Sequence, residues 1–237
     1  TESSDDDKDS DATTDDTETT ASSGLTLVLD ELEEENSNEN SNFSVSTNLI
    51  GGSNNDILSG GDQNDTIVGN GGDDIIQGYG GNDVLTGSGG SDVFKIDLGA
   101  DTITDLETGD IFLVSPKATL EAKNILSFKA TSDSQSLGTT YLYADTAGAD
   151  IDMIQSSSGS FIINGAKGND ILKGGAARDI IWSNGGTDVF TGSGGNDTFN
   201  VNLGSVTITD LRTTDNLVVW PSAVATAISV ANFTANE

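Results

Sequence analysis

The sequence predicts an all-β protein made of two tandem parallel β-solenoids with short β caps, preceded by an acidic tail. Three observations support this prediction. An Asp recurs at every ninth residue among glycines, a stretch at the end of the first repeat block returns in similar form near the end of the chain, and the first forty residues are dense in acids. These features divide the 237 residues into a tail at 1–23, a first copy at 24–132 and a second copy at 133–237.

The acidic tail is a separate compositional zone. Residues 1–40 hold 15 acids and one Lys, so they contribute −14 to the formal net charge of −30. Such a segment has too little apolar surface to offset chain entropy, and we expect residues 1–23 to be disordered when free. The stretch GLTLVLD at Gly24–Asp30 interrupts this zone with the alternation of a β-strand and opens the first copy.

The repeats have a period of nine. In frames that begin at Gly51, position 6 is Asp and position 8 is large and apolar in each of the first five turns, and a second block begins at Gly165. This period fits neither an α-helix nor a series of hairpins. It fits a short strand with one inward side chain followed by a tight loop, wound as a parallel solenoid. The glycines suit the loop, because a turn this tight needs positive φ angles.

The repeated carboxylates predict a metal site. If two nonapeptides complete one coil, Asp56 stacks beside Asp74 and Asp65 beside Asp83, and like charges this close repel one another unless a cation lies between them. Carboxylate and carbonyl oxygens favour Ca²⁺ over zinc or copper. Whether the degenerate outer turns also bind an ion is left open. The predicted ligands, from position 6 of both blocks and of their continuations, are Asp56, Asp65, Asp74, Asp83, Asp92, Asp101, Asp110, Asp170, Asp179, Asp188, Asp197 and Asp215.

The pattern Gly-Gly-x-Gly-x-Asp-x-aliphatic-x resembles the RTX, or haemolysin-type, calcium-binding repeats. GYGGNDVLT at 78–86 and GSGGNDTFN at 192–200 match it closely, whereas Asn54 and Ala177 replace the fourth-position Gly. Asn54 is the milder departure, because Asn tolerates left-handed conformations. The resemblance implies a right-handed parallel β-roll, several Ca²⁺ ions between stacked loops, and secretion in unfolded form by a type I exporter. An extracellular or cell-surface location follows, and a chain without Cys suits folding on calcium rather than on disulfides.

The chain contains an internal duplication. Residues 92–116 return at 197–221, and GTTYLYAD at Gly138 resembles GLTLVLD at Gly24. Each copy is therefore expected to contain an opening strand, a roll and a cap, with Pro116 at the end of the first stack. Val206 stands where the first copy has Asp101, so we expect the cap of the second copy to bind fewer ions.

The duplication also suggests self-association. The last cap has no strand after it, and the first strand has no cap before it. A head-to-tail homopolymer would satisfy both if Gly24–Asp30 of one subunit completed Ser222–Phe233 of the next, and a contact that does not close makes a filament or a sheet. The alternative is that Gly24–Asp30 folds onto its own copy.

Several functions are excluded or disfavoured by composition. The net charge argues against nucleic acid and anionic membranes as partners, and the chain has no apolar run long enough to span a bilayer. Without His, neither a Ser-His-Asp triad nor imidazole acid–base catalysis is available, and we expect no enzyme activity.

Two smaller features have competing interpretations. The apolar residues common at position 7 point outward, either as a lateral contact stripe or only because β-branched residues favour strands. Trp182 and Trp220 are weak evidence for sugar stacking, and we expect Trp220 to pack at the cap beside Pro221.

The leading hypothesis is an extracellular calcium-binding structural protein that folds on calcium and self-assembles into a surface layer, filament or matrix. The alternative is a secreted adhesin, or the C-terminal export and folding module of a larger type I-secreted protein.

Overall fold

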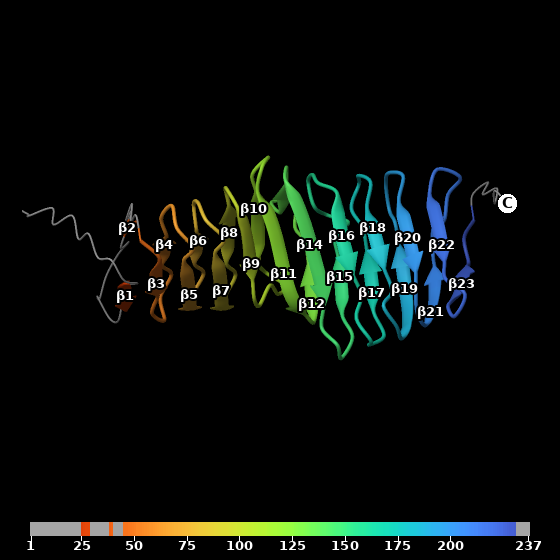
Figure 1. Ribbon diagram of the computed structural model, residues 1–237, viewed down its shortest axis with the longest axis horizontal. Coiled ribbons are helices and arrows are strands. Elements are labelled where there is room, and N and C mark those ends of the chain that lie inside the picture. The colour runs from red at the N-terminus through yellow and green to blue at the C-terminus, as the bar shows by residue number, and fades with distance from the viewer. Residues whose placement is uncertain (1–24, 29–37, 40–44, 231–237) are drawn as a thin grey trace, which may run out of the picture.

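The protein is an all-β solenoid of about ten turns. The computed structural model describes residues 25–28, 38–39 and 45–230. Figure 1 shows a rod in which the strands stack along the long axis, with β1 and β2 at one end and β22 and β23 at the other. This part of the chain contains no helix, and so none that is long and apolar enough to cross a membrane.

Three parallel sheets build the rod. The longest has eleven strands, and we call it the long sheet; a sheet of six strands lies beside each half of it. The long sheet contains, in spatial order, β1 (Leu25–Val28), β3 (Thr47–Ile50), β5 (Thr66–Gly71), β7 (Val84–Gly89), β9 (Ala100–Ile103), β11 (Thr119–Ile125), β14 (Thr139–Ala144), β16 (Phe161–Asn164), β18 (Ile180–Trp182), β20 (Thr198–Val201) and β22 (Asn216–Val219).

The two shorter sheets follow the two sequence copies. The N-terminal short sheet contains β2 (Asn38–Glu39), β4 (Ile57–Ser59), β6 (Ile75–Gln77), β8 (Val93–Ile96), β10 (Ile111–Val114) and β13 (Gln135–Ser136). The C-terminal short sheet contains β12 (Ser127–Lys129), β15 (Asp150–Asp152), β17 (Ile171–Lys173), β19 (Thr187–Thr191), β21 (Ser205–Ile208) and β23 (Val224–Ala227).

One coil of the repeat region is two nonapeptides long, as predicted. Ile57 pairs with Ile75 and Ile67 with Leu85, so each repeat lies beside the second repeat after it. The apolar residue at position 8 points inward in every regular turn, so the core is a column of stacked side chains. These are 0–1 % exposed: Leu58, Ile67, Ile76, Leu85, Phe94, Leu172, Ile181, Phe190 and Phe199.

The middle of the rod has longer coils and a more aromatic core. Thr119 pairs with Thr139 and Thr140 with Phe161, and each of these pairs is further apart in the sequence than two nonapeptides. The rings of Phe128 and Phe161 lie 5.8 Å and 6.3 Å from that of Phe112.

The first stack does not end at Pro116, which corrects the sequence-based expectation. Pro116 lies in the turn between β10 and β11, and β11 pairs with both β9 and β14. Proline is tolerated there because a residue in this turn does not need to donate a backbone N–H to a neighbouring strand. The residues expected to cap the first copy thus continue the stack, and both copies share the long sheet. The division of the chain at 132/133 stays a prediction.

The opening strand pairs within its own chain, which is the alternative to strand donation. β1 runs parallel to β3, with Leu25 opposite Thr47 and Val28 opposite Ile50. The acidic tail at 1–23 and residues 231–233 of the predicted C-terminal contact lie outside the described residues.

Position 7 points outward, and its exposure varies. Val84, Ile171 and Val189 are exposed, whereas Ile57, Ile75, Val93 and Ile180 are half-buried.

Trp182 is half-buried on the outer face of the long sheet. Trp220 does not pack into a cap: its exposed fraction is 50 %, because no described strand of the long sheet follows to cover it.

Candidate metal centre

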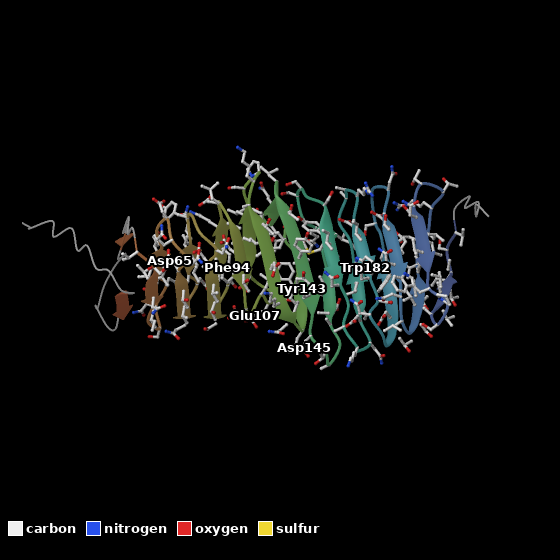
Figure 2. The ribbon with its side chains drawn as sticks, viewed as in Figure 1. Asp65, Phe94, Glu107, Tyr143, Asp145 and Trp182 are labelled. Atoms are coloured by element: carbon white, nitrogen blue, oxygen red, sulfur yellow. The ribbon has the colours of Figure 1, made fainter. Side chains whose placement is uncertain are left out.

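The predicted aspartates form stacked ladders along the rod. One set lies at the start of strands of the long sheet and the other at the start of strands of the short sheets, so the ladders follow opposite sides of each roll. All twelve lie where the sequence places them; eleven are 0–6 % exposed and Asp56 is half-buried. Figure 2 marks Asp65 in the N-terminal half of the rod. The ladders beside the long sheet are Asp65, Asp83 and Asp101, then Asp179, Asp197 and Asp215; those beside the short sheets are Asp56, Asp74, Asp92 and Asp110, then Asp170 and Asp188.

The ladders are interrupted in the middle of the rod. Leu120, Thr140 and Phe161 follow Asp101 in successive register, and the next strand of the long sheet returns to an Asp at Asp179. The central coils therefore have no position-6 carboxylate on this side.

One carboxylate oxygen of each ladder Asp from Asp65 onward ties two coils together. The backbone N–H of Asp65 donates to Oδ1 of Asp83 at 2.8 Å, and that of Asp83 donates to Oδ1 of Asp101 at 3.0 Å. The second copy repeats this bond between Asp179 and Asp197 at 2.9 Å. Oδ1 is therefore a structural acceptor, and it places consecutive carboxylates one coil apart.

The second oxygen divides eleven of the twelve turns into two kinds, and the turn of Asp92 belongs to neither on this criterion. In the first kind, a backbone N–H three or four residues earlier donates to Oδ2, as Gly61 does to Asp65 and Gly175 to Asp179, both at 2.7 Å. We call these self-capped turns, because the loop satisfies its own carboxylate. They are the turns of Asp56, Asp65, Asp110, Asp170, Asp179 and Asp215.

In the second kind, Oδ2 is buried and has no hydrogen-bond partner in the structure; we call these open turns. A buried carboxylate oxygen without a partner is costly, and such an oxygen is available to bind a cation. The open turns are those of Asp74, Asp83, Asp101, Asp188 and Asp197.

Backbone conformation distinguishes the two kinds. In four of the five open turns, position 2 has a positive φ although it is not Gly: φ is 75° at Asn70, 68° at Tyr79, 58° at Asn184 and 70° at Ser193. No position 2 of a self-capped turn between Gly51 and Asp92 or between Gly165 and Asp197 does so. A bulky residue such as Tyr79 in this region is strained, and such strain collects at ligand sites.

Main-chain carbonyls complete an oxygen-only donor set. A Cβ built on Gly69 would meet both Oδ2 of Asp74 and, at 2.9 Å, the carbonyl oxygen of Gly87 in the next coil. An acidic oxygen and a carbonyl oxygen from neighbouring coils therefore converge on a position that only Gly leaves open. In the described part of the chain, no three acidic side chains gather around one point, so a cation there needs these carbonyls. Hard oxygen donors of this kind fit Ca²⁺.

Without a bound cation, burial and mutual repulsion favour the protonated, neutral form of these carboxyl groups. Burial is the largest cause of the rise in their pKa. The neighbouring carboxylates of the same ladder raise the pKa further, and the backbone N–H bonds lower it. Together they raise the pKa to about 6 at Asp74, Asp83, Asp110 and Asp197, and to about 7 at Asp101, Asp179 and Asp188. A bound cation would displace these protons and remove the repulsion.

Two features of the site were not anticipated from the sequence. Position 5 forms a second ladder, in which Oδ1 of Asn64 accepts the N–H of Asn82 and Oδ1 of Asn82 accepts that of Ala100, at 2.8 and 2.9 Å. The recurrence of Asn at this position was a visible signal. The position-1 glycines serve a purpose other than a positive φ angle. At Gly51, Gly60 and other first positions φ is not positive, and the missing side chain makes room for the carboxylate of the same turn.

The residues that replace Gly at position 4 also differ from the sequence-based expectation. Gly72, Gly81 and Gly195 have positive φ, as predicted, and a Cβ there would strike the loop of the preceding coil. Asn54 and Ala177 do not adopt positive φ, so tolerance of the left-handed region is not what admits them. Asn54 lies in the first turn of its block and Ala177 in the second turn of its block, and both turns are self-capped.

Comparison with known proteins agrees with this geometry. The family model of the RTX calcium-binding nonapeptide repeat matches residues 47–76, 68–103 and 162–204. No curated protein matches the chain. The matched stretches contain the open turns of both copies. The two repeat blocks of this chain therefore belong to the RTX calcium-binding nonapeptide repeats, a family that binds calcium, here with repeats enough for several ions.

Proposed function

We propose that this protein is an extracellular, non-catalytic structural protein that folds on calcium and assembles into a surface layer, filament or matrix. The observation that carries the proposal is the set of buried Oδ2 atoms without partners in the open turns. A chain with 39 acids and 9 bases repels itself, and ladders of buried carboxylates concentrate that repulsion. Calcium turns the same ladders into links between coils.

The location follows from the strength expected of such sites. Extracellular calcium modules bind with a Kd of about 10⁻⁴–10⁻³ M, which suits the calcium concentration outside cells. A ligand that binds only the folded state adds about 2.7 kcal/mol of stability per site at 100 times its Kd. Several sites thus make folding depend steeply on calcium, and RTX repeats are typical of secreted proteins.

We assign the ions to the open turns, with Oδ2 of each open-turn Asp as the acidic ligand. In the self-capped turns, a backbone N–H already occupies that oxygen, so these turns hold their coils without an ion. The assigned ligands are Asp74, Asp83, Asp101, Asp188 and Asp197; Asp92, whose position-2 residue Ser88 also has a positive φ of 73°, is placed with them.

The test is to count the calcium ions bound by matched variants. Asp83→Asn alters an open turn and Asp65→Asn alters a self-capped turn; both residues are buried beside the long sheet in consecutive coils. We expect Asp83→Asn to bind about one ion fewer than the wild type. Asp65→Asn should keep the full number but melt at a lower temperature, because its amide meets the N–H of Gly61. Loss of an ion only in Asp65→Asn would overturn the assignment, and a wild type that binds no calcium would overturn the function.

The second candidate is a secreted adhesin or an export and folding module. An aromatic group on the outer face of the long sheet favours an adhesin: the rings of Tyr141 and Tyr143 stack at 6.3 Å, and Trp182 is half-buried on the same face. A protein that folds with calcium but stays monomeric would favour this candidate over the structural polymer.

A further inference from the structure

The last described coil at the C-terminal end of the rod leaves part of its core exposed. Val219 is in register with Val201, which is 0 % exposed, yet Val219 is 44 % exposed. Ala227 is in register with the fully buried Ile208 and is itself only half-buried. These positions point into the core in the preceding coil, and here the core opens because no further described coil covers it.

The two last described strands at this end also have free edges among the described strands. β22 is the last strand of the long sheet and β23 the last of the C-terminal short sheet, so each has an outer edge that pairs with no described strand. Open edges of this kind are templates for pairing with another chain. At the other end of the rod, β1 and β2 are the outermost strands of the long sheet and the N-terminal short sheet.

The two ends match in order and direction. A coil that continued the rod beyond β22 and β23 would place first a strand of the long sheet and then a strand of a short sheet, both parallel to those before. β1 and β2 of a second copy supply these two strands in that order. The contact joins two different surfaces, so it repeats without closing and extends the rod.

The charges of the two ends favour this head-to-tail contact over a symmetric contact between two identical ends. Residues 1–40 carry a net charge of −14, so two N-terminal ends repel each other. Residues 165–237 hold seven acids and four bases, and five of those acids are the buried repeat aspartates. These residues carry a net charge of −3, and two Ca²⁺ ions in the open turns of Asp188 and Asp197 would change it to +1. The C-terminal end then attracts the acidic N-terminal end.

We infer that the C-terminal end of each rod receives the N-terminal end of a second copy, with β22 pairing with β1 and β23 with β2 in parallel. The inference rests on the proposed calcium-driven assembly and specifies its contact. The strand donation considered from the sequence is thereby replaced: β1 keeps its pairing with β3 and uses its other edge.

A matched pair of variants tests the C-terminal surface. Val218 and Val219 are both 44 % exposed, but Val219 points into the core and Val218 outward, beside Asn200. An Asp at Val219 would be buried without a partner at the contact, which weakens association by at least about 100-fold. In sedimentation with millimolar Ca²⁺, we expect Val219→Asp to be monomeric and Val218→Asp to form wild-type assemblies. Circular dichroism of each variant checks that it folds.

A mixing experiment separates head-to-tail from symmetric contacts. Leu27→Asp alters β1 at the residue in register with Leu49 and leaves the C-terminal end intact, whereas Val219→Asp leaves the N-terminal end intact. Each variant alone should be monomeric, and an equimolar mixture should form a discrete dimer. Equal assembly of all variants, or a mixture that stays monomeric while the wild type assembles, would refute the contact.

The remaining outcome separates the two proposals. A wild type that gains β-structure with calcium but remains a monomer would refute the contact and the structural polymer, and it would leave the calcium sites in place. A wild type whose structure does not respond to calcium would refute the calcium-dependent function itself.

Discussion

Each repeat Asp has two oxygens with separate tasks. Oδ1 accepts an N–H from the preceding coil and holds the stack together, and Oδ2 is either capped by its own loop or left for a ligand. At Asp83, Oδ1 accepts the N–H of Asp65 at 2.8 Å, and Oδ2 is buried without a partner. The position-1 Gly lies directly against this second oxygen, so we expect calcium binding to depend on a residue that has no side chain.

Gly78→Ala tests the role of position 1. A Cβ on Gly78 would collide with the carboxylate of Asp83, whereas a Cβ on Gly80 in the same loop would meet its nearest atom at 3.5 Å. Overpacking of this kind costs about 1–3 kcal/mol. We expect Gly78→Ala to lower the melting temperature in calcium and weaken calcium binding, and Gly80→Ala to leave both near the wild-type values. Equal effects of the two substitutions would contradict this role of Gly78.

The raised pKa values predict opposite pH dependences with and without calcium. A carboxyl such as Asp101, with a folded pKa of about 7 against 3.8 for the unconstrained group, binds its proton more tightly in the folded state. The calcium-free fold therefore gains stability as pH falls from about 7.5 towards 5, since protonation removes the buried charge. Calcium affinity should fall over the same range, because the ion needs the ionised carboxylate.

The pH prediction is checked by circular dichroism in chelator and by calcium titration, each from pH 7.5 to 5. β-structure in chelator should increase on acidification while calcium binding weakens. A calcium-free protein that loses structure steadily between pH 7.5 and 5 would show that the ladder carboxylates are not buried as described.

The central strands differ from the flanking ones in what holds them together. Between Asp101 and Asp179, the long-sheet ladder contains Leu120, Thr140 and Phe161 instead of carboxylates. The core there is filled by the group of Phe112, Phe128 and Phe161. Apolar burial needs no cation, so β10 to β16 form the part of the rod least dependent on calcium.

Hydrogen exchange in chelator tests this difference. We expect amides of β11, β14 and β16 to stay protected, and those of β5, β7, β18 and β20 to exchange fast until calcium is added. Phe128→Ala should abolish the protection, because removing a buried Phe costs about 3–5 kcal/mol. Leu126→Ala is the control, since Leu126 is 59 % exposed. Uniform exchange along the whole chain in chelator would show that the rod folds as one calcium-dependent unit.

Charge is unevenly distributed along the chain, and the last described strands of the rod have unpaired edges. Its acids are concentrated in residues 1–40, whereas Glu237 is the single charged residue in the stretch 216–237. Salt screens attraction between the two ends with a Debye length of about 8 Å at physiological ionic strength. Calcium-driven assemblies should therefore shorten in sedimentation as NaCl rises, at constant calcium and constant circular dichroism. Assemblies that lengthen with salt would indicate a purely apolar contact.

The sequence predicted the repeating parts of this architecture and not the places where repeats meet. The coil of two nonapeptides and the stacking of Asp56 beside Asp74 followed from the period alone. The passage through Pro116 did not, because the coils there are longer than two nonapeptides and have no periodic signal. The difference between open and self-capped turns was also hidden: it depends on the φ angle at residues such as Tyr79 and Gly61, which composition does not determine.

A crystal structure of the full chain grown with Ca²⁺ tests the central claim most directly. We expect anomalous-scattering peaks within about 2.3–2.6 Å of Oδ2 in the open turns, including those of Asp83 and Asp188. The self-capped Oδ2 of Asp65 and Asp179 should keep their bonds to the N–H of Gly61 and Gly175. Ions at the self-capped carboxylates, with the open-turn oxygens still unbound, would contradict it.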